Sequence, residues 1–128
     1  MRYPKGYSRA MSIFTRFRQP SLSATEAMGL VSEGATLLDV RENGEWNAGH
    51  APGAVYIPLD QVSSQATRRL PKGRRVIVVC RSGARAGNAA RTLRAMGLDA
   101  VNLKGGMRAW ESAGGRLVGK GNRPGVVA

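Results

Sequence analysis

The stretch Val76-Ile-Val-Val-Cys80-Arg-Ser-Gly-Ala-Arg85-Ala-Gly-Asn-Ala-Ala90 joins a continuous apolar run to a short polar loop and then to an alanine-rich segment. A β-branched run of this length predicts a strand over residues 76–80 that is covered on both faces. Beyond the loop, apolar side chains recur at the spacing of one helical face, at Ala86, Ala89, Ala90, Leu93 and Met96. The stretch therefore predicts a strand, a tight loop and a helix, in that order.

Similar units flank this one on both sides. Three other apolar runs predict strands over residues 36–40, 55–57 and 100–103, and residues 19–22 are a candidate edge strand. A helix capped by Ser23 or Thr25 is expected to run to about Glu33, and a short helix containing Trp110 should follow Gly105-Gly106. Strands that alternate with helices in this way predict an α/β fold with a mainly parallel sheet.

Cys80 is the single cysteine of the chain and ends the strongest predicted strand. In open α/β sheets, ligands bind beyond the carboxyl ends of the strands. Backbone N–H groups of a tight loop that opens a helix, together with Arg81 and Arg85, would make an anion-binding cradle there. Such a cradle favours the thiolate, which is the nucleophilic form of cysteine. A lone cysteine at a strand end is also often a small buried hydrophobe, and Cys80 by itself leaves that alternative open.

Several separated motifs in a fixed order resemble the rhodanese family. They are Leu38-Asp-Val-Arg-Glu42, Glu45-Trp46, Gly49-His-Ala-Pro-Gly-Ala54, Cys80-Arg-Ser-Gly-Ala-Arg85, and Gly105-Gly106 with Trp110. The resemblance covers about residues 21–113 and implies a rhodanese-like α/β fold, a five-stranded, mainly parallel sheet with helices on both faces. We therefore expect a rhodanese domain over residues 19–113, a flexible basic N-terminal tail over residues 1–18, and a C-terminal tail over residues 114–128. Met11 is a second candidate for the true start of the chain.

The resemblance also implies a sulfurtransferase mechanism that needs no cofactor. Cys80 would take the outer sulfur of a donor such as thiosulfate and pass it, as a persulfide, to cyanide, a thiol or a protein acceptor. The loop formed by Arg81, Ser82, Gly83, Ala84 and Arg85 would hold the donor and the persulfide. Related phosphatases and arsenate reductases resemble this fold but carry a Cys-x5-Arg loop, one residue longer. The Cys-x4-Arg spacing found here argues against phosphatase activity.

Two further motifs of the resemblance are expected to be structural. Asp39 and Arg41 follow a predicted strand near the same edge as Cys80, and we expect them to brace the site by ion pairing and hydrogen bonds. His50, the only histidine, lies in a Gly-His-x-Pro-Gly context that indicates a turn, so we do not expect it to act as a base for Cys80. One cysteine and one histidine also make a zinc site implausible.

The net charge of +12 favours anionic partners, above all a small anionic sulfur donor. Residues 1–20 contribute five cations and no acid. A second basic cluster, Arg68, Arg69, Lys72, Arg74 and Arg75, precedes the strand at residue 76, so it should lie at the edge of the sheet opposite Cys80. We expect this cluster to be a solvated face, with RNA or an acidic protein surface as the alternative. Aromatic residues are 5% of the chain, too few for us to expect nucleic-acid binding through base stacking.

No apolar run of the chain is long enough to span a bilayer, so we expect no membrane partner. A single cysteine cannot form an intrachain disulfide, which favours a reducing, cytoplasmic location. Two hypotheses retain Cys80. The first is an enzyme, a thiosulfate or persulfide sulfurtransferase. The second is a sulfur-carrier or sensor module that serves a specific protein partner, with little turnover of small donors. A catalytically silent interaction domain usually lacks the cysteine.

Overall fold

The computed structural model describes residues 21–128, so the predicted tail over residues 1–18 and the first two residues of the candidate edge strand lie outside it. The strands are β1 (Ser21–Leu22), β2 (Thr36–Asp39), β3 (Val55–Tyr56), β4 (Val76–Val79) and β5 (Ala100–Leu103). The α-helices are α2 (Ala24–Ser32), α3 (Asn43–Ala48), α4 (Val62–Arg69), α5 (Ala84–Ala95) and α6 (Gly106–Ser112), and two short 3-10 helices cover Leu59–Gln61 and Lys120–Asn122.

The five strands form one sheet in the order β1-β5-β4-β2-β3, and every pairing between these strands is parallel. The predicted α/β fold with a five-stranded parallel sheet is thus confirmed. The strand β4 lies at the centre, with Val78 paired to Leu38 on one side and to Asn102 on the other. Cys80 follows β4 directly and so lies at the carboxyl edge, as predicted.

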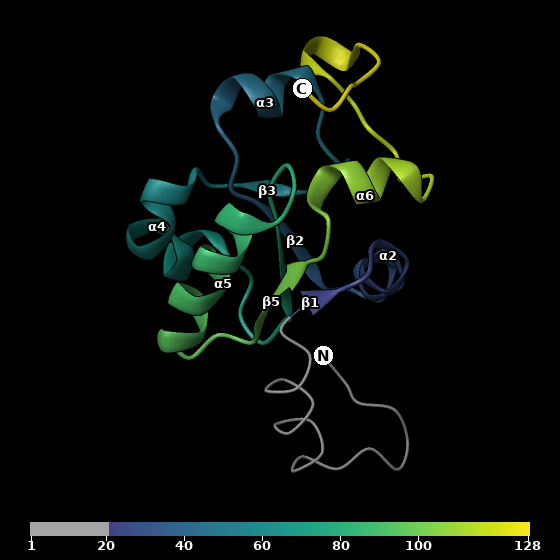
Figure 1. Cartoon of the computed structure of the whole chain (residues 1–128). Coiled ribbons are helices and arrows are strands. Elements are labelled where there is room, and N and C mark those ends of the chain that lie inside the picture. Colours follow the sequence, from purple (N-terminus) through teal and green to yellow (C-terminus); the bar gives the residue numbers. More distant parts are fainter. Residues whose placement is uncertain (1–20) are drawn as a thin grey trace.

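Helices cover both faces of the sheet (Figure 1). On one face, Val76 and Val78 pack with the buried side chains of α4 and α5. On the other face, Ile77 and Val79 pack with α2 and α6, including Met107 of α6. Because successive strand side chains point to opposite faces, the unbroken run at residues 76–79 supplies both halves of the core.

The two helices that we did not predict, α3 and α4, carry weak local patterns. The six residues of α3 include no buried side chain, and α4 buries only Val62 and Ala66. A helix with so few buried positions shows no clear apolar periodicity in the sequence. The predicted helix α2 is confirmed, and it begins at a capping box formed by Ser23 and Glu26.

Residues 115–128, which we call the C-terminal strap, fold back beside α3 (Figure 1). Val118 and His50 exchange backbone hydrogen bonds of 2.9 and 3.0 Å, and the Val126 N–H donates to the Ala48 carbonyl at 2.9 Å. A Cβ built on Gly49 would lie 2.2 Å from the Val126 carbonyl oxygen. The expected C-terminal tail therefore makes close backbone contacts with the segment after α3.

The helices of residues 21–128 include none that is long and apolar enough to cross a membrane.

Candidate active site

Cys80 and the loop after it lie where β4 ends and α5 begins. The Gly83 N–H donates to Cys80 Sγ at a distance of 3.0 Å. Gly83 adopts a positive φ of 127°, which glycine tolerates and other residues rarely adopt. Cys80 itself is only 1% exposed and belongs to the core cluster on the α4 and α5 face. The loop thus aims a backbone donor at the sulfur while keeping the thiol out of bulk water.

The helix α6 docks directly on the start of this loop. The N–H groups of Met107 and Arg108 donate to the carbonyls of Cys80 and Arg81 at 2.8 and 3.3 Å. A Cβ on Gly106 would lie 2.4 Å from the Cys80 carbonyl oxygen, and Gly106 has a φ of 61°. Gly106, the first residue of α6, therefore permits this approach, a role that the sequence pattern did not indicate.

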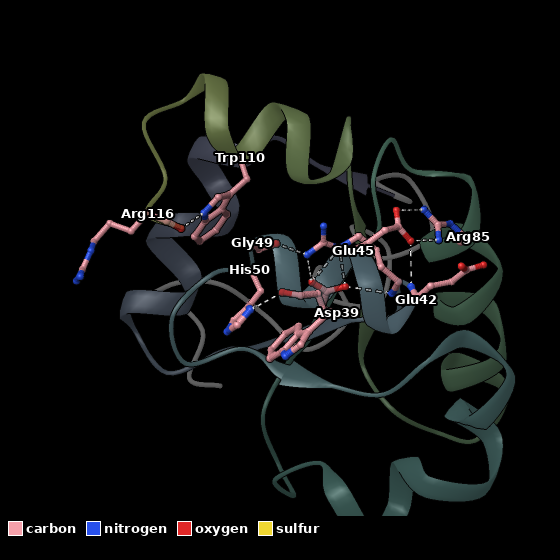
Figure 2. A network of polar contacts seen from close by, with 10 residues as sticks. Asp39, Glu42, Glu45, Gly49, His50, Arg85, Trp110 and Arg116 are labelled. Atoms are coloured by element: carbon pink, nitrogen blue, oxygen red, sulfur yellow. Dashed lines mark hydrogen bonds and ion pairs between the residues drawn. The ribbon is translucent and has the colours of Figure 1, made fainter. Parts of the chain in front are cut away.

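Arg85, the last residue of the predicted loop, pairs with Glu45 of α3. Its two terminal nitrogens donate to the two carboxylate oxygens at 2.7 and 2.9 Å (Figure 2). These hydrogen bonds from Arg85 lower the pKa of Glu45 from 4.5 to about 2 and raise the pKa of Arg85. Both groups therefore stay charged, and Glu45 offsets much of the positive charge that we expected Arg85 to bring to the loop.

The other loop residues differ in exposure and partners. Arg81 is half-buried, and its Nε donates to the backbone oxygen of Ala128 in the C-terminal strap at 2.8 Å. Ser82 and Ala84 are exposed. The structure therefore brings the strap into direct contact with a residue beside Cys80, which no local sequence pattern indicated.

Asp39 and Arg41 form a fully buried ion pair at the end of β2. Arg41 Nε and Nη2 donate to the Asp39 carboxylate at 2.7 to 3.1 Å, and the Arg41 backbone N–H donates to it at 3.0 Å. Arg41 Nη2 also donates to the Gly49 carbonyl at 2.7 Å (Figure 2). These contacts tie the end of β2 to the turn after α3, which is the geometry of a brace.

His50 lies just after α3 and makes its side-chain contacts with Trp46 of that helix. Its ring stacks on Trp46 with the ring centroids 3.6 Å apart, and Nδ1 lies 2.8 Å from the Trp46 carbonyl oxygen. Trp46 stacks in turn on Tyr56 of β3. These contacts give His50 a packing role beside α3.

Across residues 21–128, no three His, Cys, Asp or Glu side chains are grouped in a way that could hold a metal ion.

Fold and site together define an α/β protein whose single cysteine begins a short loop at the carboxyl edge of a parallel sheet, with a backbone N–H donating to its sulfur. The chain matches the family model of the rhodanese-like domain over residues 23–113, and it belongs to that family. This confirms the resemblance seen in the motifs.

Individual relatives agree with this assignment. The chain is 40% identical over 79 residues to "Putative sulfur carrier protein YrkF" of Bacillus subtilis, a match that covers 61% of this chain and 42% of that protein. It is 36% identical over 84 residues to "Sulfurtransferase" of Allochromatium vinosum, covering 65% of this chain and 78% of that one. The solution structure of the rhodanese-like domain of the Anabaena Alr3790 protein superimposes with a TM-score of 0.70 at 31% identity, over 79% of this chain and 80% of that chain.

Proposed function

We propose that the protein is a sulfurtransferase that carries sulfane sulfur as a persulfide on Cys80. The observation that carries this proposal is the 3.0 Å hydrogen bond from the Gly83 N–H to Cys80 Sγ, at the carboxyl edge of the central strand. A backbone donor aimed at the sulfur stabilises negative charge both on the thiolate and on the persulfide that replaces it. Of the two relatives described above, one is named a putative sulfur carrier protein and the other a sulfurtransferase.

The proposed reaction is a double displacement. In the first step, the Cys80 thiolate attacks the outer sulfur of thiosulfate, so a new S–S bond forms on Cys80 and the S–S bond of thiosulfate breaks. The electron pair of the broken bond leaves with sulfite. In the second step, an acceptor such as cyanide attacks the outer sulfur of the persulfide, and the Cys80 thiolate leaves. Neither step changes the number of protons or needs an outside oxidant.

A second function, a sulfur carrier or sensor that serves one protein partner, is favoured by the charges around the loop. The cation of Arg85 is paired with Glu45, and Arg81 Nε donates a hydrogen bond to the backbone oxygen of Ala128. Cys80 is also nearly inaccessible to solvent. Fewer unpaired cations and a covered thiol suit a site that opens when a protein partner docks, more than a site that captures small free anions.

The test is the intact mass of the protein after incubation with thiosulfate, and again after cyanide is added, beside a Cys80→Ser variant. We expect the wild-type protein to gain one sulfur atom that cyanide removes, and the variant to gain none. A gain of sulfur by the variant would contradict the assignment of Cys80 as the carrier.

A second measurement separates the two functions. If thiosulfate adds no sulfur but a protein persulfide does, the carrier function is the correct one. If neither donor loads Cys80 while iodoacetamide still alkylates it, both functions are wrong. Comparing the loading rates for the two donors then ranks small-molecule turnover against transfer between proteins.

A further inference from the structure

A cleft lies at the amino-terminal edge of the sheet, on the side opposite Cys80. It has a volume of about 460 Å³ and is formed by residues 66–67 and 70–75, between α4 and β4, and by residues 96–99, between α5 and β5. A second cleft of about 580 Å³ lies beside it, against residues 32–35. The two clefts share the loop Lys72–Arg75, so we call them together the amino-edge cleft.

The amino-edge cleft combines apolar lining with cations. Leu70, Leu98 and Met96 line the first cleft. Met96 is 38% exposed and is one of two large hydrophobic side chains that are exposed in residues 21–128, the other being Val126. Leu70 is 5% exposed and forms the floor of the cleft, while Leu98 is half-buried and Met96 is the exposed apolar side chain at its wall.

Cations flank this apolar lining. Lys72 and Arg74 are exposed, and Arg74 is oriented by a hydrogen bond of 3.1 Å to the Gly34 carbonyl. Arg75 faces Asp99 at 3.7 Å, and Glu33 lines the second cleft. The exposed cation Arg68 lies in the last turn of the adjacent helix α4, whereas Arg69 donates to the Tyr56 carbonyl at 3.2 Å and is not counted here. The surroundings of the cleft are therefore positive overall, even with these two acids counted.

We propose that the amino-edge cleft binds an acidic segment of a partner protein, with an apolar side chain of that segment seated against Leu70, Met96 and Leu98. The carboxylates of the segment would pair with Lys72 and Arg74 at the rim. This inference is independent of the persulfide chemistry, because the cleft lies at the other edge of the sheet. A partner bound there would leave the Cys80 loop free to exchange sulfur, so the cleft would act as a tethering site.

The charge of the chain argues against two other occupants of the amino-edge cleft. Residues 1–20 carry five cations and no acid, so they have the wrong sign to fill the cleft. A second copy of the chain carries the same net charge of +12, which disfavours self-association through a basic surface. The lining of either cleft contains no aromatic side chain on which a nucleic-acid base could stack. A peptide with acidic and apolar residues matches both the rim and the lining.

The experiment pans a phage-displayed library of random short peptides on the full chain, with counter-selection on a Lys72→Glu, Arg74→Glu double variant. The matched control is a Lys120→Glu, Arg123→Glu double variant, which makes the same charge change in the C-terminal strap. A Met96→Ser variant tests the apolar lining separately. Thermal unfolding of each variant verifies that it is folded.

We expect the selected peptides to be rich in Asp and Glu around a Leu, Ile, Met or Phe. The best of them, made synthetically, should bind the cleft double variant at least about tenfold more weakly and the strap control within about twofold of wild type. Met96→Ser should weaken binding by about threefold or more. Amide chemical shifts should change at residues 66–75 and 96–99.

Several results would overturn the proposal. One is a selection that yields no peptide distinguishing wild type from the cleft double variant, and another is equal weakening in the strap control. A third is a synthetic RNA duplex that binds the same residues more tightly than the selected peptides do, which would assign the cleft to nucleic acid. Loading of Cys80 with sulfur is measured on the same variants, so failure of the tethering site and failure of the persulfide mechanism are distinguishable.

Discussion

Arg41 carries a guanidinium group into the protein interior, where neither it nor its partner Asp39 is exposed to solvent. Burying two charges is costly, and the cost is repaid only when the pair is close and well hydrogen-bonded. Here the carboxylate receives both the side chain and the backbone N–H of Arg41, and the Gly49 carbonyl takes a further hydrogen bond. The pair is thus the anchor that holds the turn after α3 to the end of β2.

Asp39→Ala should destabilise the protein strongly, because it leaves the buried Arg41 charge without its counter-ion. We expect the free energy of unfolding to fall by about 3 to 5 kcal/mol, as measured by urea denaturation. The control is Asp60→Ala, at an exposed aspartate, which should change it by less than about 0.5 kcal/mol. Equal effects of the two substitutions would contradict the bracing role of Asp39.

The ion pair of Glu45 with Arg85 should make stability depend on pH. Because the pKa of Glu45 is about 2 in the folded protein against 4.5 ordinarily, its stabilising contribution is complete above about pH 4.5. That contribution is lost as the pH falls towards 2. At pH 7 we expect Glu45→Gln to lower the free energy of unfolding by about 1 to 2 kcal/mol, less than the full shift implies because both side chains are partly exposed.

The measurement is a series of urea denaturations of wild type and Glu45→Gln between pH 7 and pH 2.5. The difference between the two proteins should shrink across the acid part of this range. Glu111→Gln, at an exposed glutamate of α6, serves as the control and should track wild type at every pH. A difference that persists unchanged at the lowest pH would show that Glu45 acts through packing and not through its charge.

At the scale of elements, the contact between α6 and the Cys80 loop depends on a missing side chain. Gly106 has a left-handed φ, and a Cβ there would overlap backbone atoms of Cys80 and Arg81 at 2.4 to 2.5 Å. Backbone cannot move aside as the end of a flexible side chain can. The position of α6 and the conformation of the Cys80 loop are therefore coupled through this residue.

Gly106→Ala should displace α6 and disturb the loop. We expect a loss of about 2 kcal/mol or more in the free energy of unfolding and a changed rate of Cys80 alkylation by iodoacetamide. The matched control is Gly29→Ala in α2, where a Cβ meets nothing within 4 Å. That variant should be unchanged or more stable by up to about 1 kcal/mol, because alanine favours the helix. Gly106→Ala with wild-type stability and alkylation would refute the coupling.

On the scale of the whole molecule, the C-terminal strap joins segments that lie far apart in the sequence. It pairs with His50, contacts Ala48 and Gly49, and hydrogen-bonds to Arg81 in the Cys80 loop. Trp110 of α6 also donates from its indole nitrogen to the Arg116 carbonyl at 3.0 Å (Figure 2). The strap lies outside the region matched by the family model, which ends at residue 113.

Gly49→Ala should loosen the strap, because the new Cβ would collide with the backbone of Val126. Hydrogen exchange followed by NMR should show faster exchange of the Val118 and Val126 amides, by about tenfold or more, while the amides of β4 keep their protection. The matched control is Gly44→Ala in α3, where a Cβ meets nothing within 4 Å. Unchanged exchange in Gly49→Ala would mean that the strap adapts without cost.

The two edges of the sheet carry different features. The carboxyl edge of the sheet holds Cys80, and the amino edge holds the basic loop Lys72–Arg75 with the cleft beside it. Parallel strands make this separation possible, since all of them start at one edge and end at the other. We therefore expect that substitutions in the amino-edge cleft will leave the loading of Cys80 with sulfur unchanged.

Much of the architecture could be predicted from the sequence. The run at residues 76–79 predicted a strand because a continuous β-branched segment is a strong local signal for one. The helix α5 followed from apolar side chains at helical spacing, and the position of Cys80 followed from the rule that sites lie beyond the carboxyl ends of parallel strands. Ordered motifs spread over the chain were enough to indicate the rhodanese family.

Tertiary structure alone decided how the site is assembled. Glu45 and Arg85 are 40 residues apart in the chain, and nothing local to either one indicates that they pair. The contacts of Gly49 with Val126 and of Gly106 with Cys80 likewise depend on where whole elements come to rest. A local pattern reports which face of its own segment is buried, whereas a contact between distant segments depends on the packing of the entire core. For that reason the sequence predicted the sheet and the position of Cys80 at its carboxyl edge, and only the folded chain revealed which contacts hold the loop after Cys80 in place.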